Sequence, residues 1–394
     1  MPSIAGRGLE GLRVVIVLKW AGLGGAERQA LVLARHLVEV EGAVVEVRAL
    51  NNADGRARER FRDAGIPWVA IRGRWRGSPP RTATRLARGA VFLRRARPDV
   101  LLPYCDVPNV VSGLLWRYTG ARTCVWNQRD TLSFTLGERL AGRALRNSPM
   151  ILSNSDHGAE FIAAHGAPRE RIRIVPNGVD LPPPAASRPE WRRRLGVGSS
   201  DLVVSSLAHF YARKDHETLL VAWQRALARA DGDRSSLTLV LAGRPEGRVD
   251  VLRDVAHNLG VDDRVRFVGD VEDVAGLLEA SDVSILSSPT EGCANAVLES
   301  MAAGLPVVGT DIPGIRDALG EGQREFLAPL GDADALGAAL SRLCDDDALR
   351  SAVGGRNLER QRAVYGRERM VEETMRAIVD GLEANRPSPP ARRR

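Results

Sequence analysis

Four cysteines are few for 394 residues, and no two of them form a C-x-x-C pair. Their scatter argues against a disulfide framework or a structural zinc site and favours reduced thiols in a cytosol. Long apolar runs are also missing, since the longest early one, Val14–Leu18, is too short for a signal-peptide core or a membrane span. We therefore expect a cytoplasmic protein without a transmembrane helix.

Several catalytic signatures are absent. The six histidines contain no H-x-x-x-H pair, and neither a Walker loop nor a G-x-S-x-G elbow occurs. Two D-x-D pairs, Asp231-Gly232-Asp233 and Asp332-Ala333-Asp334, have a spacing used by metal-dependent enzymes. Both precede or open helical stretches, so we expect no metal ion and no other cofactor.

Lysine is almost absent, because Lys19 and Lys214 are the only two among 56 basic residues. Residues 1–190 carry 29 basic against 17 acidic residues, a net charge of +12, whereas residues 191–394 carry a net charge of −5. A basic first half favours an anionic partner such as a membrane surface, a polyphosphate or nucleic acid. A coding bias toward arginine is the alternative explanation.

The chain has the composition of a soluble globular protein, with 44% apolar and 27% charged residues. Short apolar runs alternate with segments of helical periodicity, which predicts parallel sheets with helices on both faces. The predicted strands are 13–18, 44–50, 68–71, 99–104, 122–127, 150–154, 172–176, 202–207, 237–242, 265–268, 283–287 and 306–309.

The proline run Pro182-Pro183-Pro184 interrupts this alternation like a linker. We therefore predict an α/β fold of two doubly wound, Rossmann-like domains, residues 1–185 and 186–385, followed by a disordered basic tail, 386–394. Ligands of such sheets bind beyond the carboxyl ends of the strands, so two facing domains would share one cleft.

The segment from Ser281 to Asp317 holds the strongest candidate site. A strand is followed by a loop with Glu291, then by a helix that begins near Asn295 and carries Glu299. Both glutamates can face the crevice at the strand's carboxyl end. Carboxylates suit sugar recognition because they accept hydrogen bonds from vicinal hydroxyls, and amides at the helix start can meet a phosphate. Among 49 acidic residues this spacing alone would mean little, and the loop-and-helix context gives it weight.

Two further clusters follow predicted strands. His209 to His216 includes Lys214, and a fixed cation there suits a diphosphate leaving group, although a solvated turn is the alternative. Gly22 to Glu27 opens a helix but does not fit G-x-G-x-x-G, so a dinucleotide fingerprint is not supported. Its small residues still allow close approach of a diphosphate or sugar, and a tight structural turn explains them equally well.

Together these segments resemble the retaining family-4 glycosyltransferases of the GT-B fold, from about residue 11 to residue 370. The E-x7-E motif of that family corresponds to Glu291 and Glu299, with Gly292, Asn295 and Gly304-Leu305-Pro306-Val307-Val308 as its usual neighbours. Similar matches are Pro176-Asn177-Gly178-Val179-Asp180, Gly24-Gly25-Ala26-Glu27 and Val265–Gly269.

The resemblance implies roles for these residues. Glu291 would contact hydroxyls of the transferred sugar, Glu299 the ribose, and Lys214 the donor diphosphate, with Glu291 and Lys214 as the catalytic pair. Gly24 and Gly25 would border the diphosphate from the first domain. The remaining donor-binding candidates are Gly292, Asn295, His209, Arg213 and Val268.

Three positions depart from the family pattern. His209 stands where many members have an arginine on the diphosphate, so that contact is weaker or comes from Arg213. Asn127-Gln128-Arg129-Asp130 replaces a segment in which many members carry a histidine, and Arg129 and Asp130 become acceptor-side candidates by their place after a strand. Pro313 replaces the first glycine of a common pair and leaves Gly314.

The implied reaction is metal-independent sugar transfer with retained configuration from a UDP-, GDP- or ADP-linked donor. The acceptor is open, and a lipid-linked or cell-surface glycan precursor is one class that fits. Alternatives with this fold are an epimerase and a phosphorylase, which needs a lysine in a cofactor site that neither lysine offers. A non-catalytic protein that binds nucleic acid or lipid headgroups is the alternative from another class. The intact Glu291, Glu299 and Lys214 argue against it, and nucleic acid is not expected as a partner.

One hypothesis concerns the basic first half. Residues 81–97 are predicted to form a helix with Arg81, Arg85, Arg88 and Arg95 on one stripe, and Phe92 falls within that stripe. Trp75 lies among arginines just upstream. Aromatic rings beside cations suit a peripheral contact with an anionic membrane. Packing of both rings against neighbouring elements is the alternative.

Overall fold

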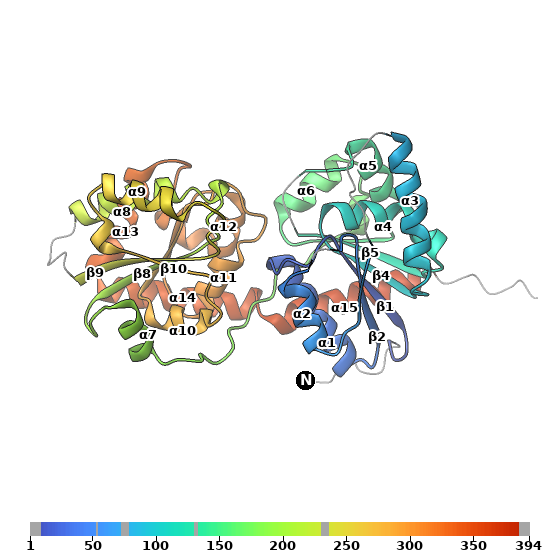
Figure 1. Ribbon diagram of the computed structural model, residues 1–394, viewed down its shortest axis with the longest axis horizontal. Helices are drawn as coiled ribbons and strands as arrows, with labels where there is room; N and C mark the ends of the chain where they lie inside the picture. Colours follow the sequence, from blue (N-terminus) through green and yellow to red (C-terminus); the bar gives the residue numbers. More distant parts are fainter. Residues whose placement is uncertain (1–8, 53, 72–78, 130–132, 230–235, 386–394) are drawn as a thin grey trace, which may run out of the picture. The chain divides into compact units, whose positions relative to one another are not determined.

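The computed structural model describes residues 9–52, 54–71, 79–129, 133–229 and 236–385. The chain divides into two compact units, Met1–Gly178 with Arg367–Arg394 and Val179–Gly366. Each unit is built on one parallel sheet with helices on both faces (Figure 1). The predicted fold class, a pair of doubly wound α/β domains, is therefore confirmed.

The described part of the first unit contains a seven-stranded parallel sheet in the order β3-β2-β1-β4-β5-β6-β7. Its central strands are buried along nearly their whole length, which explains why they read as continuous apolar runs. The strands are β1 (Arg13–Leu18), β2 (Val44–Ala49), β3 (Trp68–Ala70), β4 (Val100–Pro103), β5 (Thr123–Gln128), β6 (Met150–Ser153) and β7 (Ile172–Ile174).

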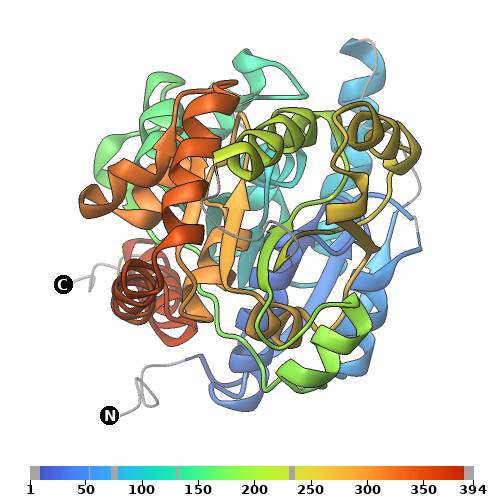
Figure 2. The ribbon, with the colours of Figure 1, turned by 90° about the vertical axis from the view of Figure 1, so that its left-hand side faces the viewer.

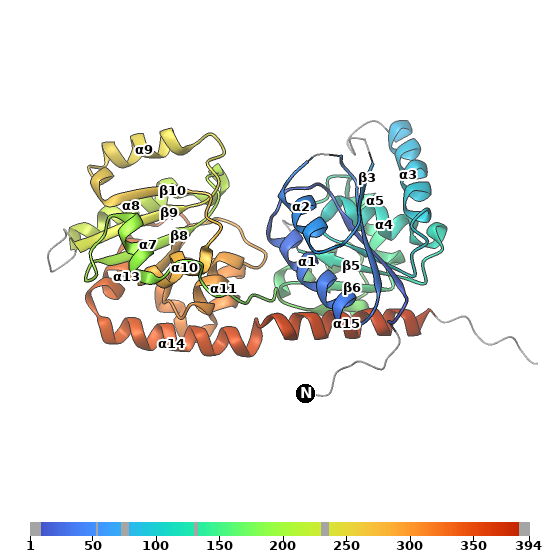
Figure 3. The same ribbon diagram turned by 60° about the horizontal axis from the view of Figure 1, so that its bottom comes forward.

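Helices cover both faces of this sheet. One face carries α1, α2 and α15, and the other carries α3 to α6 (Figures 1 and 3). Their bounds are α1 (Gly25–Glu39), α2 (Arg56–Asp63), α3 (Pro79–Arg94), α4 (Asp106–Thr119), α5 (Glu138–Asn147), α6 (Asp156–Ala164) and α15 (Arg367–Ala384), with the 3-10 turn η1 (Arg169–Arg171) before β7.

The second unit contains, in its described residues, a six-stranded parallel sheet in the order β10-β9-β8-β11-β12-β13. Its strands are β8 (Leu202–Leu207), β9 (Leu237–Ala242), β10 (Val265–Gly269), β11 (Val283–Leu286), β12 (Val307–Thr310) and β13 (Leu327–Ala328). The short 3-10 turns are η2 (Ala212–Lys214), η4 (Asp262–Arg264) and η5 (Glu321–Phe326).

The helices of the second unit also pack on both faces. α8, α9 and α13 share one core with the sheet, and α7 with α10 closes the opposite face, so that α7 and α8 lie on opposite sides (Figure 2). The bounds are α7 (Arg188–Leu195), α8 (His216–Arg229), α9 (Val249–Asn258), α10 (Val274–Ala280), α11 (Asn295–Ala302), α12 (Pro313–Leu319), α13 (Ala333–Asp345) and α14 (Asp347–Val364).

The domain assignment of the last helix needs correction. The sequence placed residues 186–385 together, but α15 packs beside α1 and on β5 and β6 of the first unit (Figure 3). Its apolar face, with Met370, Met375 and Ile378, belongs to the core of that unit. The structure also places the first crossing between units after Gly178, before the proline run. The proposed tail, 386–394, lies outside the described residues.

The hypothesis that Phe92 lies in an exposed, membrane-facing stripe of arginines on α3 is wrong for Phe92. Phe92 is only 9% exposed and packs in a core cluster with Leu93 and Trp116, and the guanidinium of Arg48 lies 5.0 Å from the centre of its ring. Phe92 is therefore a packing residue, as the alternative explanation had it. Trp75 and the side chain of Arg81 lie outside the described part of the chain.

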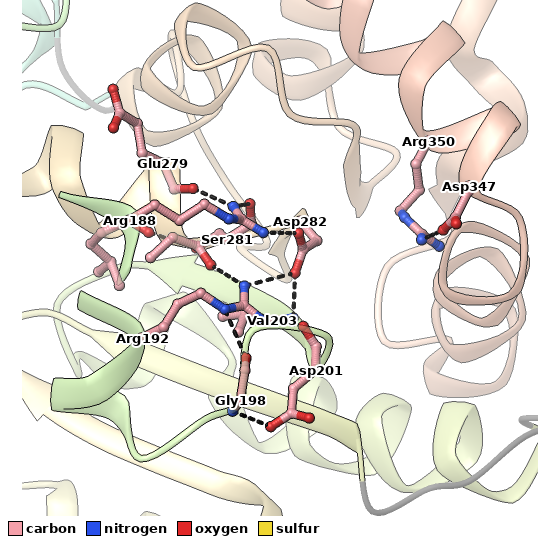
Figure 4. Close-up of polar contacts among 12 residues, drawn as sticks. Arg188, Arg192, Gly198, Asp201, Val203, Glu279, Ser281, Asp282, Asp347 and Arg350 are labelled. Carbon is pink, nitrogen blue, oxygen red and sulfur yellow. Dashed lines mark hydrogen bonds and ion pairs between the residues drawn. The ribbon is translucent and has the colours of Figure 1, made fainter. Parts of the chain in front are cut away.

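A polar network fastens the amino edge of the second sheet. Asp282, directly before β11, accepts hydrogen bonds from the backbone N–H of Val203 at 2.8 Å and from Arg188 at 2.6 Å (Figure 4). Arg192 lies 3.4 Å from the same carboxylate and donates to the carbonyls of Ala280 and Gly198. Because Arg192 is only 3% exposed, this network keeps a buried charge satisfied.

Candidate active site

The turn that carries Lys214 is anchored to the end of a neighbouring strand. Lys214 ends the 3-10 turn η2, and Asp215 follows with a left-handed backbone (φ 51°) that non-glycine residues seldom adopt. The hydroxyl of Ser287, just after β11, donates to the carbonyls of Lys214 at 3.1 Å and Asp215 at 2.8 Å. These contacts fix Lys214 at the carboxyl edge of the sheet.

Lys214 and Glu291 meet at this edge. The ammonium group contacts the Glu291 carboxylate, and the two side chains are only 20% and 16% exposed. A Cβ atom at Gly314, in the first turn of α12, would lie 2.3 Å from the Glu291 carbonyl oxygen, so only glycine fits there. Pro313, the residue before it, occupies the first helical turn, where proline is well tolerated.

Three loops of the second unit are joined at the same edge. The backbone N–H of Gly243 donates to the carbonyl of Gly269 at 2.7 Å, and a Cβ at Gly243 would lie 2.0 Å from the Ala208 carbonyl. The loops after β8, β9 and β10 therefore pack backbone against backbone. Val268, predicted to border the nucleotide base, is half-buried within β10 beside this junction.

His209 lies in this junction beside an arginine that the sequence analysis did not single out. The backbone N–H of Arg244 donates to Nδ1 of His209 at 3.2 Å, and a guanidinium nitrogen lies 3.1 Å from Nε2. Burial, followed by the Arg244 charge, lowers the pKa of His209. The ring is therefore neutral at neutral pH. Arg244 follows β9, and its place after a buried strand is the signal that would have found it.

Glu299 and its neighbours lie on α11. Glu299 and Asn295 are half-buried, one helical turn apart, and Gly292 lies in the loop that leads into the helix. The Ser300 hydroxyl donates to Ser284 in β11 at 2.8 Å, which holds the helix against the strand that ends in the Glu291 loop. The predicted glutamates thus belong to adjacent elements of one rigid unit.

Two other residues of the His209–His216 segment have packing contacts. Arg213 is exposed, and its guanidinium lies 5.1 Å from the ring centre of Tyr211. His216 is 2% exposed and packs edge-on against Phe210, and burial lowers its pKa to about 4. His216 is therefore neutral at neutral pH and does not add a charge beside Lys214.

The glycine loop of the first unit starts α1. Gly24 is the residue before the helix, and its N–H donates to the carboxylate of Glu27 at 3.0 Å. Gly25 is the first helical residue and is exposed. The Glu27 side chain therefore satisfies one of the amides that the sequence analysis offered to a diphosphate. Trp20, also at this edge, is the one exposed tryptophan among the described residues (51%).

Arg129 lies at the carboxyl end of β5 in the first unit. Its side chain is 8% exposed and donates to the amide oxygen of Asn177 at 2.7 Å. Burial raises the pKa of the neighbouring Tyr104 to about 12, and the Arg129 charge opposes that rise. Arg129 is thus a buried cation at the predicted edge. Asp130, the other acceptor-side candidate, lies outside the described residues.

The aspartates of the second D-x-D pair, Asp332 and Asp334, both have partners within the protein. Asp332 caps α13 by accepting from the N–H of Ala335 at 2.9 Å, and Asp334 pairs with Arg225 at 3.1 Å. Asp231-Gly232-Asp233 lies outside the described residues. In the part of the chain that the structure describes, no group of three or more histidine, cysteine, aspartate and glutamate side chains could hold a metal ion.

Two parallel, doubly wound sheets with polar residues gathered at their carboxyl ends are features of GT-B type α/β proteins. Family comparisons agree with this class. Residues 201–346 match the model described as "Glycosyl transferases group 1", and residues 23–182 match "Glycosyltransferase Family 4". The chain belongs to this glycosyltransferase family.

Curated relatives support the assignment. The chain is 31% identical over 288 residues to the lipopolysaccharide core biosynthesis glycosyltransferase LpsE of Rhizobium meliloti (strain 1021), which covers 73% of this chain and 77% of LpsE. It is also 31% identical over 251 residues to the D-inositol 3-phosphate glycosyltransferase of Kineococcus radiotolerans. In that match the chain spans only 58% of the relative's length, which is also 58% of this chain.

Solved structures show the same fold. The structure of Anabaena Alr3699/HepE in complex with UDP and glucose superimposes with a TM-score of 0.79 at 19% identity, covering 94% of this chain and all of HepE. WaaG, a glycosyltransferase involved in lipopolysaccharide biosynthesis, gives a TM-score of 0.69 at 18% identity over 93% of this chain and 99% of WaaG.

None of the described helices is long and apolar enough to cross a bilayer.

Proposed function

We propose that this glycosyltransferase moves a sugar from a nucleotide-sugar donor to a glycan acceptor with retention of configuration at the anomeric carbon. The contact between Lys214 and Glu291 at the carboxyl edge of the second sheet carries the proposal. It joins a cation suited to a diphosphate with a carboxylate suited to sugar hydroxyls. The displacement occurs on the face from which the diphosphate leaves, and no enzyme nucleophile is assigned.

The Lys214–Glu291 pair also suggests how the site accepts its donor. Before binding, each charge is balanced by the other within a largely buried pair. The donor diphosphate would replace Glu291 as the partner of Lys214, and the released carboxylate would then accept hydrogen bonds from sugar hydroxyls. A fixed cation that is already in place stabilises the growing charge on the leaving diphosphate without a divalent metal.

The comparisons support particular substrates. HepE has been solved with UDP and with UDP-glucose, which supports a UDP-linked donor. GDP- and ADP-linked donors remain the alternatives. LpsE acts in lipopolysaccharide core biosynthesis, which supports an acceptor that is a lipid-linked or cell-surface glycan precursor. We propose that the transfer takes place in the cytoplasm.

The first prediction separates the two glutamates. Glu299→Ala should weaken the binding of bare UDP, because Glu299 is assigned to the ribose. Glu291→Ala should leave UDP binding within about twofold but lower turnover by about 100-fold or more, because its contact is with the transferred sugar. Isothermal calorimetry with UDP, then with GDP and ADP, tests both the division and the choice of nucleotide. Equal losses of nucleotide affinity in the two variants would contradict it.

We also propose a membrane contact on the exposed face of α3. Phe92 is no longer part of it, because its side chain is buried. Arg88 and Val91 are exposed on α3, and Arg95 is exposed in the turn that directly follows the helix, four residues after Val91. Replacing Arg88 and Arg95 together by glutamate should lower binding to anionic vesicles at least about tenfold. Cosedimentation with anionic and neutral vesicles measures this, with Phe92→Leu as the control that keeps binding. Binding that ignores lipid charge would refute the contact.

A further inference from the structure

His209 and Arg244 leave two hydrogen-bond donors facing one another. Because the backbone N–H of Arg244 donates to Nδ1, the neutral imidazole carries its proton on Nε2. The guanidinium nitrogen Nη2 lies 3.1 Å from that Nε2 and is also a donor. Two donors cannot hydrogen-bond to each other, but an acceptor oxygen that lies beside the pair, within hydrogen-bond distance of both nitrogens, would accept from both.

Charges of both signs surround His209, and among them Arg244 has the largest effect on the ring. Arg244 and Lys214 both act on the His209 ring as positive charges, and Asp270 and Glu246 act as negative ones. The carboxylate of Glu246 lies 3.8 Å from Nε of Arg244, at the outer limit of an ion pair, and both side chains are about one third exposed.

The backbone holds Arg244 in this position. The carbonyl of Arg244 accepts from the N–H of Phe210 at 2.9 Å, while its own N–H donates to the His209 ring. The preceding residue, Gly243, lies against the Ala208 carbonyl so closely that no side chain fits. A cation on a fixed backbone needs less ordering when a ligand binds than one on an exposed turn.

Arg213 is less well placed for the same task. It is exposed on the η2 turn, and its guanidinium lies over the ring of Tyr211. Leaving that ring would cost the cation–π contact and side-chain entropy. The cation that complements Lys214 therefore comes from the loop after β9 and not from the turn after β8.

We propose that the Arg244 guanidinium and the Nε2–H of His209 together form a second phosphate-binding subsite beside Lys214, which holds oxygens of the donor diphosphate. The inference rests on the proposed function of the site. Arg244 supplies the charge, and His209 is both a neutral donor and the acceptor that positions the Arg244 backbone. The arginine that many family members carry at position 209 is thus replaced by a pair of residues from the loops after β8 and β9.

The test compares ligands that differ only in phosphate. Arg244→Ala should weaken UDP by about 10- to 100-fold, as expected for the loss of a charge-assisted contact, and leave uridine within about twofold. Arg264→Ala, an arginine at the opposite edge paired with Asp263, is the control and should change neither. Calorimetry with UDP and uridine measures all of these, with GDP and guanosine as the second ligand pair.

A second variant separates a phosphate contact from a structural role. Adding His209→Arg to Arg244→Ala places a guanidinium where the imidazole lay and should restore UDP affinity to within about fivefold of the wild type. Equal losses for UDP and uridine, or no recovery in the double variant, would overturn the subsite. If Arg244→Ala is silent while Lys214→Ala weakens UDP, this inference alone fails. If Lys214→Ala is also silent, the proposed donor site fails with it.

Discussion

Lys214→Ala is expected to lower kcat by about 100- to 1,000-fold, the range found when one preorganised group that stabilises developing charge is removed. The side chain is 80% shielded from solvent and is held at the strand end by the Ser287 contacts, so no solvent cation replaces it. Steady-state kinetics with the donor identified by calorimetry would measure the loss. Lys214→Arg should recover only part of it, because a planar guanidinium does not fit a site built for a point charge.

Two controls make this result specific. Arg225→Ala removes a surface cation of α8 that pairs with Asp334 and should leave kcat within about twofold. Excess EDTA should also leave the wild-type activity within about twofold, because in the proposed mechanism Lys214 and backbone amides take the place of a metal ion. Activity that is lost in EDTA and restored by manganese or magnesium would contradict this role and make the D-x-D pairs the candidate metal ligands.

Asp282→Ala is expected to cost about 3 kcal/mol of unfolding free energy and to lower the melting temperature by about 6–12 °C. The change removes the acceptor of the Val203 N–H and of Arg188, and it leaves the buried Arg192 with carbonyl partners but no carboxylate (Figure 4). Chemical denaturation and thermal unfolding measure the loss. UDP affinity at a temperature where the variant is folded should stay within about twofold, because the network lies at the strand end opposite Lys214.

Asp347→Ala is the matched control for Asp282→Ala. Asp347 pairs with Arg350 at the start of α14, but its side chain is 91% exposed (Figure 4). A pair of this kind contributes little, so Asp347→Ala should shift the melting temperature by no more than about 2 °C. Equal shifts in the two variants would show that burial of Arg192 does not decide the stability of this edge.

The strands were predictable because burial on both faces leaves a direct trace in the sequence. Val14–Leu18 is a continuous apolar run and Leu237–Ala242 is interrupted only by Thr238, and the structure confirms strands there. β13 was missed because it has only two residues, Leu327 and Ala328, at the edge of its sheet. A segment that short has no periodicity to read.

The site could be predicted only where it follows strand ends along the chain. Lys214 and Glu291 were found that way, and the structure brings their side chains into contact. The pairing of His209 with Arg244 depends on which loops lie side by side, and the order β10-β9-β8 cannot be read from one segment. The prediction that Phe92 faces a membrane was wrong for a similar reason, because the arginine that covers its ring, Arg48, comes from β2.

The position of α15 in the sequence affects the order in which the two units can fold during synthesis. Because α15 supplies Met370, Met375 and Ile378 to the core around β5 and β6, the first unit lacks part of its core until α15 has been synthesised. The unit Val179–Gly366 is continuous, so all of its residues leave the ribosome earlier. Nascent domains usually mature from the amino terminus onward. Here the strands of the first unit are synthesised before Val179–Gly366 but wait for α15, which follows it, so the later-encoded unit is the first whose folding can be finished.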